Sequence, residues 1–171
     1  ESVERPLVYH SNNTAKAIEF LRACEGARVE RFVFSSTCAT YGVPPQDMIP
    51  IGEDAPTEPI NPYGWSKLAF ERVLSDHATN KQRLGEPFAF AALRYFNVAG
   101  ADPDGLLGEN HDPETHLIPN AILAALGEGP TLTVYGEDHP TPDGTAVRDY
   151  IHVTDLARAH TMVLGALDPE S

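Results

Sequence analysis

The chain has 171 residues, of which 42% are hydrophobic, so it is long enough for one domain of ordinary size and too apolar to be disordered throughout. Its formal net charge of -13 argues against nucleic-acid binding, which needs a basic surface. It does not exclude an anionic small molecule, because one or two well-placed arginines can outweigh the overall field locally.

The cysteine content and the hydropathy restrict the setting further. Cys24 and Cys38 are too few for a disulfide framework and lack the spacing of a metal site, which fits a reduced, cytoplasmic environment. No apolar run is long enough to cross a membrane, and no signal peptide is recognisable. We therefore expect a cytoplasmic protein that has neither a membrane nor a nucleic acid as its partner.

Apolar strands and amphipathic helices alternate along the chain. The first helix has apolar side chains at helical spacing, and Asn12 or Asn13 can cap it. The elements predicted in chain order are a helix over 11–25, a strand over 28–36, a loop over 37–62, a helix over 63–78, a strand over 87–97, a loop over 101–114, a helix over 117–126, strands over 131–136 and 146–153, and a helix over 154–167.

This alternation indicates an α/β fold. Strands that are apolar throughout, each followed by a helix, are typical of a parallel sheet covered on both faces. Such sheets hold ligands at the carboxyl ends of their strands. Two stretches fall there: SSTCATYG, which follows Phe34, and FNVAGA, which follows Tyr95.

One element that such a sheet often carries is missing from these residues. A dinucleotide-binding sheet shows Gly-x-Gly-x-x-Gly after its first strand, and the nearest approach, Gly127 and Gly129, has Leu132 in the sixth position. The chain also opens inside apparent structure and stops just after a helix. We therefore expect it to be the central part of a longer protein.

Tyr63 and Lys67 lie four positions apart on a predicted helix, so they share one face of it. A tyrosine with its ordinary pKa near 10 is a poor base, and a neighbouring positive charge favours the phenolate. Phe70 and Leu74 continue the stripe, which turns this face toward the interior. The pair can still be a capped helix with a core aromatic and a surface lysine, since Tyr-x-x-x-Lys is common by chance.

Five further positions are candidates for binding. Ser35, Ser36 and Thr37 end the first strand, where a hydroxyl can orient a substrate or can merely satisfy a local turn. Arg148 offers a rigid guanidinium fork to phosphate, or forms an ion pair with a carboxylate. Asn97, which ends the second predicted strand, is a phosphate or base ligand or a simple turn residue.

A metal site is also considered for the segment GENHDPETH, which contains His111, Asp112, Glu114 and His116. The segment is polar and contains a proline, so these residues do not form a ligand pair on one helical face. The sequence therefore predicts no metal site. His152 and Asp155 are explained more simply as a strand end and a helix start.

Several motifs together resemble a known family. FVFSSTCATYG, NPYGWSK, LRYFNVAGA, THLIPNAI and DGTAVRDYIHVTDLARAH occur in the order found in the extended short-chain dehydrogenase/reductases, which include the NAD-dependent epimerases and dehydratases. Within them the chain is most similar to the UDP-glucose 4-epimerases. The resemblance runs along nearly the whole chain.

The resemblance implies roles for individual residues. Tyr63 would be the catalytic acid and base, Lys67 would hold the nicotinamide ribose of NAD and lower the tyrosine pKa, and Thr37 would bind the sugar 4-hydroxyl. Asn12 and Phe96 match positions that contact NAD. The positions that would line the UDP-sugar are Asn97, Leu117, Thr133, Val134, Tyr135, Arg148 and His116, the last standing where many relatives have asparagine.

The resemblance also implies a domain plan and a reaction. Residues 1–98 would be the second part of a Rossmann-like, doubly wound NAD-binding domain, 99–146 a substrate-binding insertion, and 147–171 a return strand and helix. The implied reaction is 4-epimerisation of a UDP-hexose such as UDP-glucose or UDP-galactose through a 4-keto sugar, in a homodimer. The alternatives are another nucleotide-sugar epimerase, a dehydratase or decarboxylase, a non-catalytic binding protein, or an inactive fragment.

Overall fold

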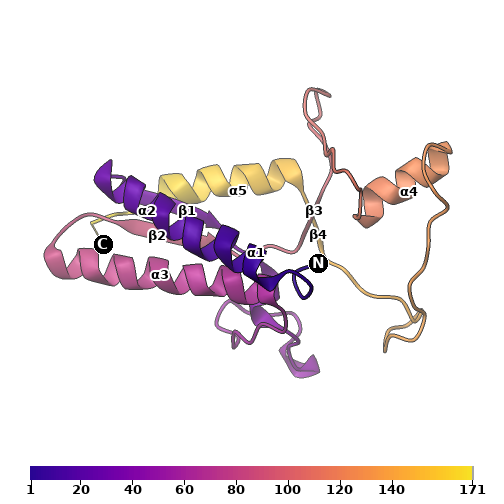
Figure 1. Ribbon diagram of the computed structural model, residues 1–171, viewed down its shortest axis with the longest axis horizontal. Coiled ribbons are helices and arrows are strands. Elements are labelled where there is room, and N and C mark those ends of the chain that lie inside the picture. Colours follow the sequence, from indigo (N-terminus) through magenta and orange to yellow (C-terminus); the bar gives the residue numbers. More distant parts are fainter. Residues whose placement is uncertain (171) are drawn as a thin grey trace. The chain divides into compact units, whose positions relative to one another are not determined.

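The computed structural model describes residues 1–170 and contains two compact units, which are treated separately (Figure 1). Unit 1 comprises Glu1–Phe96 and Arg158–Ser171, and unit 2 comprises Asn97–Ala157. The predicted domain limits at 98, 146 and 147 stay a prediction.

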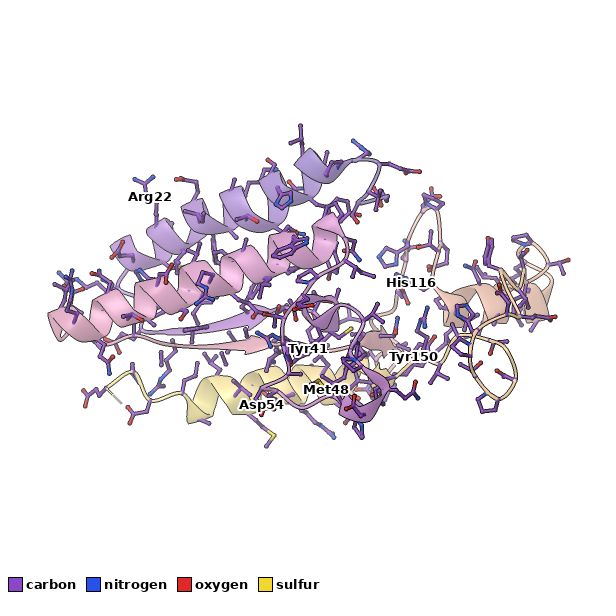
Figure 2. The ribbon with its side chains drawn as sticks, turned by 90° about the horizontal axis from the view of Figure 1, so that it is seen from below. Arg22, Tyr41, Met48, Asp54, His116 and Tyr150 are labelled. Atoms are coloured by element: carbon purple, nitrogen blue, oxygen red, sulfur yellow. The ribbon has the colours of Figure 1, made fainter. Side chains whose placement is uncertain are left out.

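Unit 1 is built on two parallel strands. β1 (Arg31–Ser35) pairs with β2 (Ala89–Leu93) in parallel. Helices α2 (Lys16–Gly26) and α3 (Pro62–Leu84) lie on one side of this pair, and the part of α5 (Val153–Ala166) that belongs to unit 1, from residue 158 on, lies on the other (Figures 1 and 2). The prediction of an α/β fold with parallel strands covered on both faces is confirmed.

Aromatic and leucine side chains fill the space between α2, α3 and the strands. Phe70 and Leu74 are almost fully buried, and the Phe70 ring packs edge-on against Phe34 of β1 with 4.9 Å between ring centroids. Leu21 and Phe88 complete the buried cluster. The stripe that begins at Tyr63 therefore does face the interior, as its spacing predicts.

The helical boundaries differ from the prediction at the amino terminus. The first helical segment starts at α1 (Pro6–His10), passes through a π-helical turn over Ser11–Ala15, and continues into α2. The prediction that Asn12 or Asn13 caps the helix is therefore wrong. Pro6 supplies the start instead, because its fixed φ suits the first helical turn.

Helix α3 begins as the sequence predicts and ends later. Asn61 caps it by accepting a hydrogen bond from the backbone N–H of Gly64 at 2.9 Å, and Pro62 follows in the first turn. The helix continues six residues beyond the predicted end at 78 and stops at Gly85, whose φ of 68° is the left-handed conformation that glycine adopts readily. The loop over 37–62 contains short 3₁₀ turns at Cys38–Tyr41 and Gln46–Met48.

Unit 2 contains its own pair of parallel strands. β3 (Asn97–Ala99) pairs with β4 (Tyr150–His152), so the single strand predicted over 87–97 is in fact two strands with a break at residues 94–96. Helix α4 (Leu117–Leu126) has the predicted bounds, and Asp155 lies in the first turn of α5 as expected.

The strand predicted over 131–136 was wrong: within residues 1–170 this segment forms no strand. Val134 is 61% exposed and Tyr135 is 97% exposed, so the β-branched and aromatic side chains have no neighbouring strand against which to pack. The strand predicted over 146–153 shortens to β4 for a related reason, since only its last part meets β3. Across the described part of the chain, no helix is both long and apolar enough to span a bilayer.

Candidate active site

The turn after β1 is buried and held by its own hydroxyl groups. Thr37 caps the 3₁₀ turn at Cys38–Tyr41 by accepting a hydrogen bond from the Ala39 N–H at 3.2 Å, and its carbonyl accepts one from the Thr40 hydroxyl at 2.9 Å. The local turn considered for these hydroxyls is thus present. It fixes Thr37 in place, which does not prevent the Thr37 hydroxyl from also serving a ligand.

The first turn of α3 lies directly against this strand-end turn. A Cβ atom added to Gly64 would approach the Ala39 carbonyl oxygen to 2.6 Å and the Pro59 side chain to 2.9 Å. Both distances are too short for a real contact, so only glycine permits this approach. Gly64 is therefore required for the close approach of α3 to this turn, and that approach sets the position of Tyr63.

Tyr63 is half-buried between the strand-end turn and the amino-terminal helix. Burial raises the pKa of its phenol above the ordinary value, and a hydrogen bond with the Thr37 side chain acts in the opposite direction. The Tyr9 ring meets it edge-on at a centroid distance of 6.0 Å. Tyr63 and Thr37 are thus brought together as the sequence predicts.

Lys67 lies one helical turn beyond Tyr63 and points to the same strand end. Its Nζ donates a hydrogen bond to the Ser35 carbonyl at 3.0 Å and lies 5.0 Å from the centroid of the Phe34 ring. Burial lowers the lysine pKa. Without a cofactor, burial has the largest effect on the Tyr63 pKa, and the Lys67 ammonium group donates to a backbone carbonyl, so the lowering of the tyrosine pKa by Lys67 stays a prediction.

A third residue on the same helical face was not predicted. Glu71, one further turn along α3, is buried and accepts a very short hydrogen bond from the Ser36 hydroxyl. Its carboxylate also pairs with the Arg94 guanidinium at 2.5 Å, which raises the arginine pKa. The guanidinium carbon lies 5.0 Å from the centroid of the Tyr41 ring.

The signal for Glu71 was present in the sequence. It lies four residues after Lys67, on the stripe that also holds Phe70 and Leu74, where an unpaired carboxylate would be costly. A cavity of about 940 Å³ in unit 1 is lined by Tyr41, Glu71 and Arg94 among others, but by neither Tyr63 nor Lys67. Cavity size therefore does not mark the catalytic candidates, and the side-chain chemistry does.

The two remaining candidates of unit 1 are less constrained. Asn12 lies in the π-helical turn, where its side-chain oxygen accepts a hydrogen bond from Lys16 at 2.8 Å. Phe96 is 40% exposed, just after β2. The strand-end residues suit the ribose and nicotinamide end of a dinucleotide, because hydroxyl and amino groups cluster where β1 ends. The glycine-rich pyrophosphate turn is not among these 171 residues.

In unit 2 the predicted substrate residues surround one cavity. It has a volume of about 560 Å³ and lies beside the amino-terminal end of α4 and the strand pair. The predicted residues that line it are Asn97, His116, Leu117, Thr133, Val134, Tyr135 and Arg148. The chain therefore gathers all seven, although the segments that carry them are far apart in the sequence.

Arg148 does not form the ion pair that was its simpler explanation. Within residues 1–170 it has no carboxylate partner at ion-pair distance, and its Nη1 donates a hydrogen bond to the Val147 carbonyl at 2.8 Å. Its side chain is exposed and lines the cavity. A positive group with unused donors beside a cavity is suited to an anionic ligand.

Comparisons with known proteins show the family to which the chain belongs. The profile of the NAD dependent epimerase/dehydratase family matches residues 1–171, so the chain belongs to that family. It is 50% identical to a UDP-glucose 4-epimerase of Lacticaseibacillus casei over 168 residues, which is 98% of this chain and 49% of that protein. The chain thus spans about half the length of this relative.

Solved structures show the same relationship. The UDP-glucose 4-epimerase of Brucella ovis in complex with NAD is 53% identical with a TM-score of 0.88, over 96% of this chain and 49% of that one. The enzyme of Bifidobacterium longum in complex with NAD+ and UDP is 40% identical with a TM-score of 0.90, over 99% of this chain and 50% of that one. The Rossmann-like fold predicted from the sequence is confirmed.

The buried pair of Glu71 and Arg94 should be essential for stability. We expect Glu71→Gln to lower the free energy of unfolding by about 3 kcal/mol, because it leaves a half-buried guanidinium without its counter-charge. Chemical denaturation measures the loss. Glu19→Gln is the matched control, because Glu19 pairs with Arg22 at 3.3 Å on the surface and should matter by less than about 1 kcal/mol. Equal losses in both variants would contradict the structural role of Glu71.

Proposed function

We propose that the protein carrying this chain is an NAD-dependent UDP-sugar 4-epimerase that acts on UDP-glucose and UDP-galactose. The observation that carries the proposal is the convergence of Tyr63, Lys67 and Thr37 where β1 ends, in a chain of the NAD dependent epimerase/dehydratase family. Its similarity to 4-epimerases of known structure supports the choice within the family.

The chain's own groups supply proton transfer and positioning. Tyr63 removes the proton of the sugar 4-hydroxyl and later returns it, while Thr37 holds that hydroxyl in line with the phenol. NAD, when bound, would supply the acceptor and later the donor of the hydride of carbon 4. Lys67 would bind the nicotinamide ribose with its ammonium group, whose Nζ lies 6.0 Å from the centroid of the Tyr63 ring, and this charge would favour the phenolate.

This role for Lys67 requires a change from the geometry described above. Its Nζ donates a hydrogen bond to the Ser35 carbonyl, and burial lowers its pKa. A ribose hydroxyl and a phenolate would therefore stabilise the charged ammonium group more than its present surroundings do. Burial likewise holds Tyr63 protonated until a positive charge approaches. Proton removal is thereby coupled to the presence of the cofactor.

The cavity of unit 2 is proposed to bind the UDP portion of the substrate. Arg148 would clamp the diphosphate, and Asn97, Leu117 and the segment 133–135 would line the remainder. His116 also lines the cavity, but its Nδ1 is engaged by two carboxylates. The binding energy of the remote nucleotide would retain the 4-keto sugar while it turns to present its other face. A homodimer in the cytoplasm, as in the resemblance drawn above, is part of the same proposal.

A nucleotide-sugar dehydratase is the alternative on the same scaffold. Eliminating water across carbons 5 and 6 needs an acid and a base near carbon 6. In the related dehydratases these follow directly after the strand-end threonine as an aspartate and a glutamate, whereas here Cys38 and Ala39 stand there. Alanine transfers no proton, so the residues favour an epimerase.

Replacing the proposed base should abolish turnover without abolishing binding. We expect Tyr63→Phe to lower the rate of epimerisation by about a hundredfold to ten-thousandfold, because only the phenol oxygen is lost. UDP binding, measured by calorimetry, should be unchanged. Tyr9→Phe is the matched control, since it keeps the ring that meets Tyr63 and leaves the proposed base in place. Wild-type turnover in Tyr63→Phe would contradict the assignment.

The proposed diphosphate clamp can be tested with a conservative change. We expect Arg148→Lys to weaken the binding of UDP by about tenfold to a hundredfold, because lysine cannot reproduce a two-pronged contact. Titration calorimetry with UDP measures the affinity. Arg22→Lys, at an exposed arginine in unit 1, is the control for the effect of replacing an arginine by lysine away from the cavity. Equal affinities for UDP in all three proteins would remove Arg148 from the site.

The product distinguishes the epimerase from the dehydratase. After incubation with UDP-galactose, proton NMR should show UDP-glucose and an intact carbon 6. A 4-keto-6-deoxy sugar nucleotide, recognised by its new methyl signal, would identify a dehydratase even if Tyr63 proved essential.

A further inference from the structure

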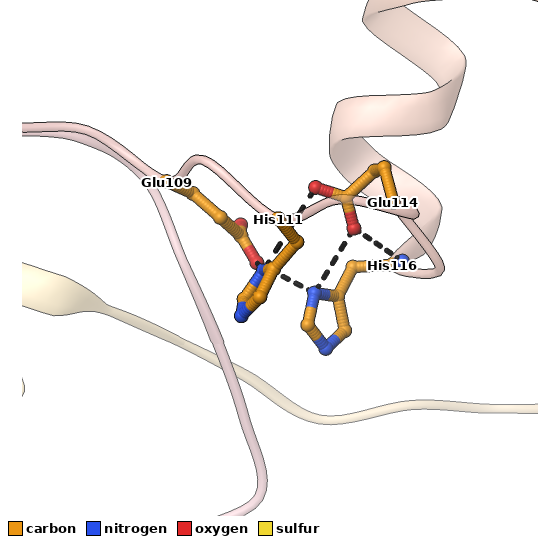
Figure 3. Close-up of side chains that lie close together, drawn as sticks. All are labelled: Glu109, His111, Glu114 and His116. Carbon is orange, nitrogen blue, oxygen red and sulfur yellow. Dashed lines mark hydrogen bonds and ion pairs between the residues drawn. The ribbon is translucent and has the colours of Figure 1, made fainter.

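Two histidines and two glutamates of unit 2 point into one small space (Figure 3). They are Glu109, His111, Glu114 and His116, four residues from a run of eight that leads into α4. Each offers one ligand atom, and these atoms all lie within 4.8 Å of one another. His116 and Glu109 also line the cavity proposed for UDP, but neither the family comparison nor the proposed reaction assigns a role to the four residues together.

The donor atoms lie close enough together for small side-chain adjustments to place them around one metal ion. His111 Nδ1 lies 2.9 Å from Glu109 Oε1, and His116 Nδ1 lies 2.5 Å from the same oxygen. His116 Nδ1 is also 3.2 Å from Glu114 Oε1, and His111 Nδ1 is 4.0 Å from Glu114 Oε2. Ligands bound tetrahedrally at about 2.0–2.1 Å are about 3.3 Å apart, which is the middle of this range.

The backbone holds two of the four donors in position. Glu114 accepts hydrogen bonds from the N–H groups of Thr115 and His116 at 2.7 Å and 2.8 Å. These two backbone bonds fix the orientation of the Glu114 carboxylate toward the histidines. The backbone carbonyl of His116 in turn accepts a hydrogen bond from the Asn120 N–H at 3.2 Å, which ties this histidine to the first turn of α4.

The rings of the two histidines pack edge-on with 4.9 Å between their centroids, and both turn Nδ1 toward the carboxylates. Both Nδ1 atoms face the same oxygen of Glu109. A divalent ion placed among these groups would be bound by the imidazole lone pairs and the carboxylate oxygens. Two carboxylates also balance its charge.

We propose that Glu109, His111, Glu114 and His116 form a binding site for a divalent transition metal of the zinc class. Two imidazoles with two carboxylates suit such an ion, whereas Ca²⁺ and Mg²⁺ prefer oxygen ligands throughout. The ion would tie the loop before α4 to the start of that helix. This revises the expectation of no metal site, which considered only ligands on one helical face and did not include Glu109.

The probes are Zn²⁺ and Co²⁺ added to untagged, chelator-treated protein, without NAD or sugar nucleotide. Titration calorimetry should show about one Zn²⁺ per chain, and Co²⁺ should give the intense visible absorption of a four-coordinate ion. His111→Ala and Glu109→Gln should each weaken Zn²⁺ binding by at least about tenfold and remove the Co²⁺ band. Acidification, which protonates imidazole, should release the metal.

His10→Ala is the matched control, because His10 is an exposed histidine of α1 outside the cluster and should leave Zn²⁺ affinity unchanged. Circular dichroism establishes that each variant is folded. Absence of saturable Zn²⁺ binding, or binding by the folded His111→Ala protein that equals that of the parent, would overturn the site and leave a network of protonated histidines. Because no substrate is present, neither result depends on the proposed epimerase activity.

Discussion

One face of α3 is in register with the end of β1, and the candidate active site follows from that register. Tyr63, Lys67 and Glu71 are spaced one helical turn apart, and they hydrogen-bond Thr37, the Ser35 carbonyl and the Ser36 hydroxyl respectively. Gly64 allows the helix to approach closely enough for these contacts. A shift of α3 by a single residue would separate all three pairs, so the same contacts stabilise the fold and position the chemistry.

The contacts of Glu71 contribute most to the stability of this arrangement, and the contacts of Tyr63 serve the proposed chemistry. Glu71 and Arg94 form an ion pair that is largely removed from water, beside the Phe70 and Leu74 core. At the other end the phenol and the amine are half-buried, and burial disfavours the charged form of each. A ligand that offers a compensating charge or hydrogen bond would therefore favour the charged form of each group.

The sequence predicted the parts of the molecule that depend on local chemistry. Asn61 and Pro62 determine the start of α3, and the four-residue spacing of Tyr63 and Lys67 determines which face carries them. The sequence did not predict the features that depend on distant partners. Glu71, for example, is buried because it pairs with Arg94, which is 23 residues away. The segment 131–136 has the composition of a strand but no strand beside it, and β propensity reflects that neighbour more than the backbone itself.

The candidate metal cluster, which lies in a loop, was likewise not predicted from the sequence. Its ligands are close in sequence, yet spacing rules for helices and zinc motifs do not cover a polar loop that contains Pro113. Only the folded segment shows that Glu109 joins the cluster and that neighbouring Asp112 does not. In both places, residue types suggested the chemistry and the three-dimensional arrangement selected the participants.

The most direct measurement is the ionisation of Tyr63 itself, followed by NMR of protein labelled with ¹³C at the tyrosine ring carbon that bears the hydroxyl. Without cofactor the Tyr63 pKa should lie above the ordinary value of 10.0, and Thr37→Val should raise it further, because burial raises this pKa and the Thr37 hydrogen bond lowers it. A pKa at or below the ordinary value, or one that Thr37→Val leaves unchanged, would contradict the placement of Tyr63 against the strand-end turn.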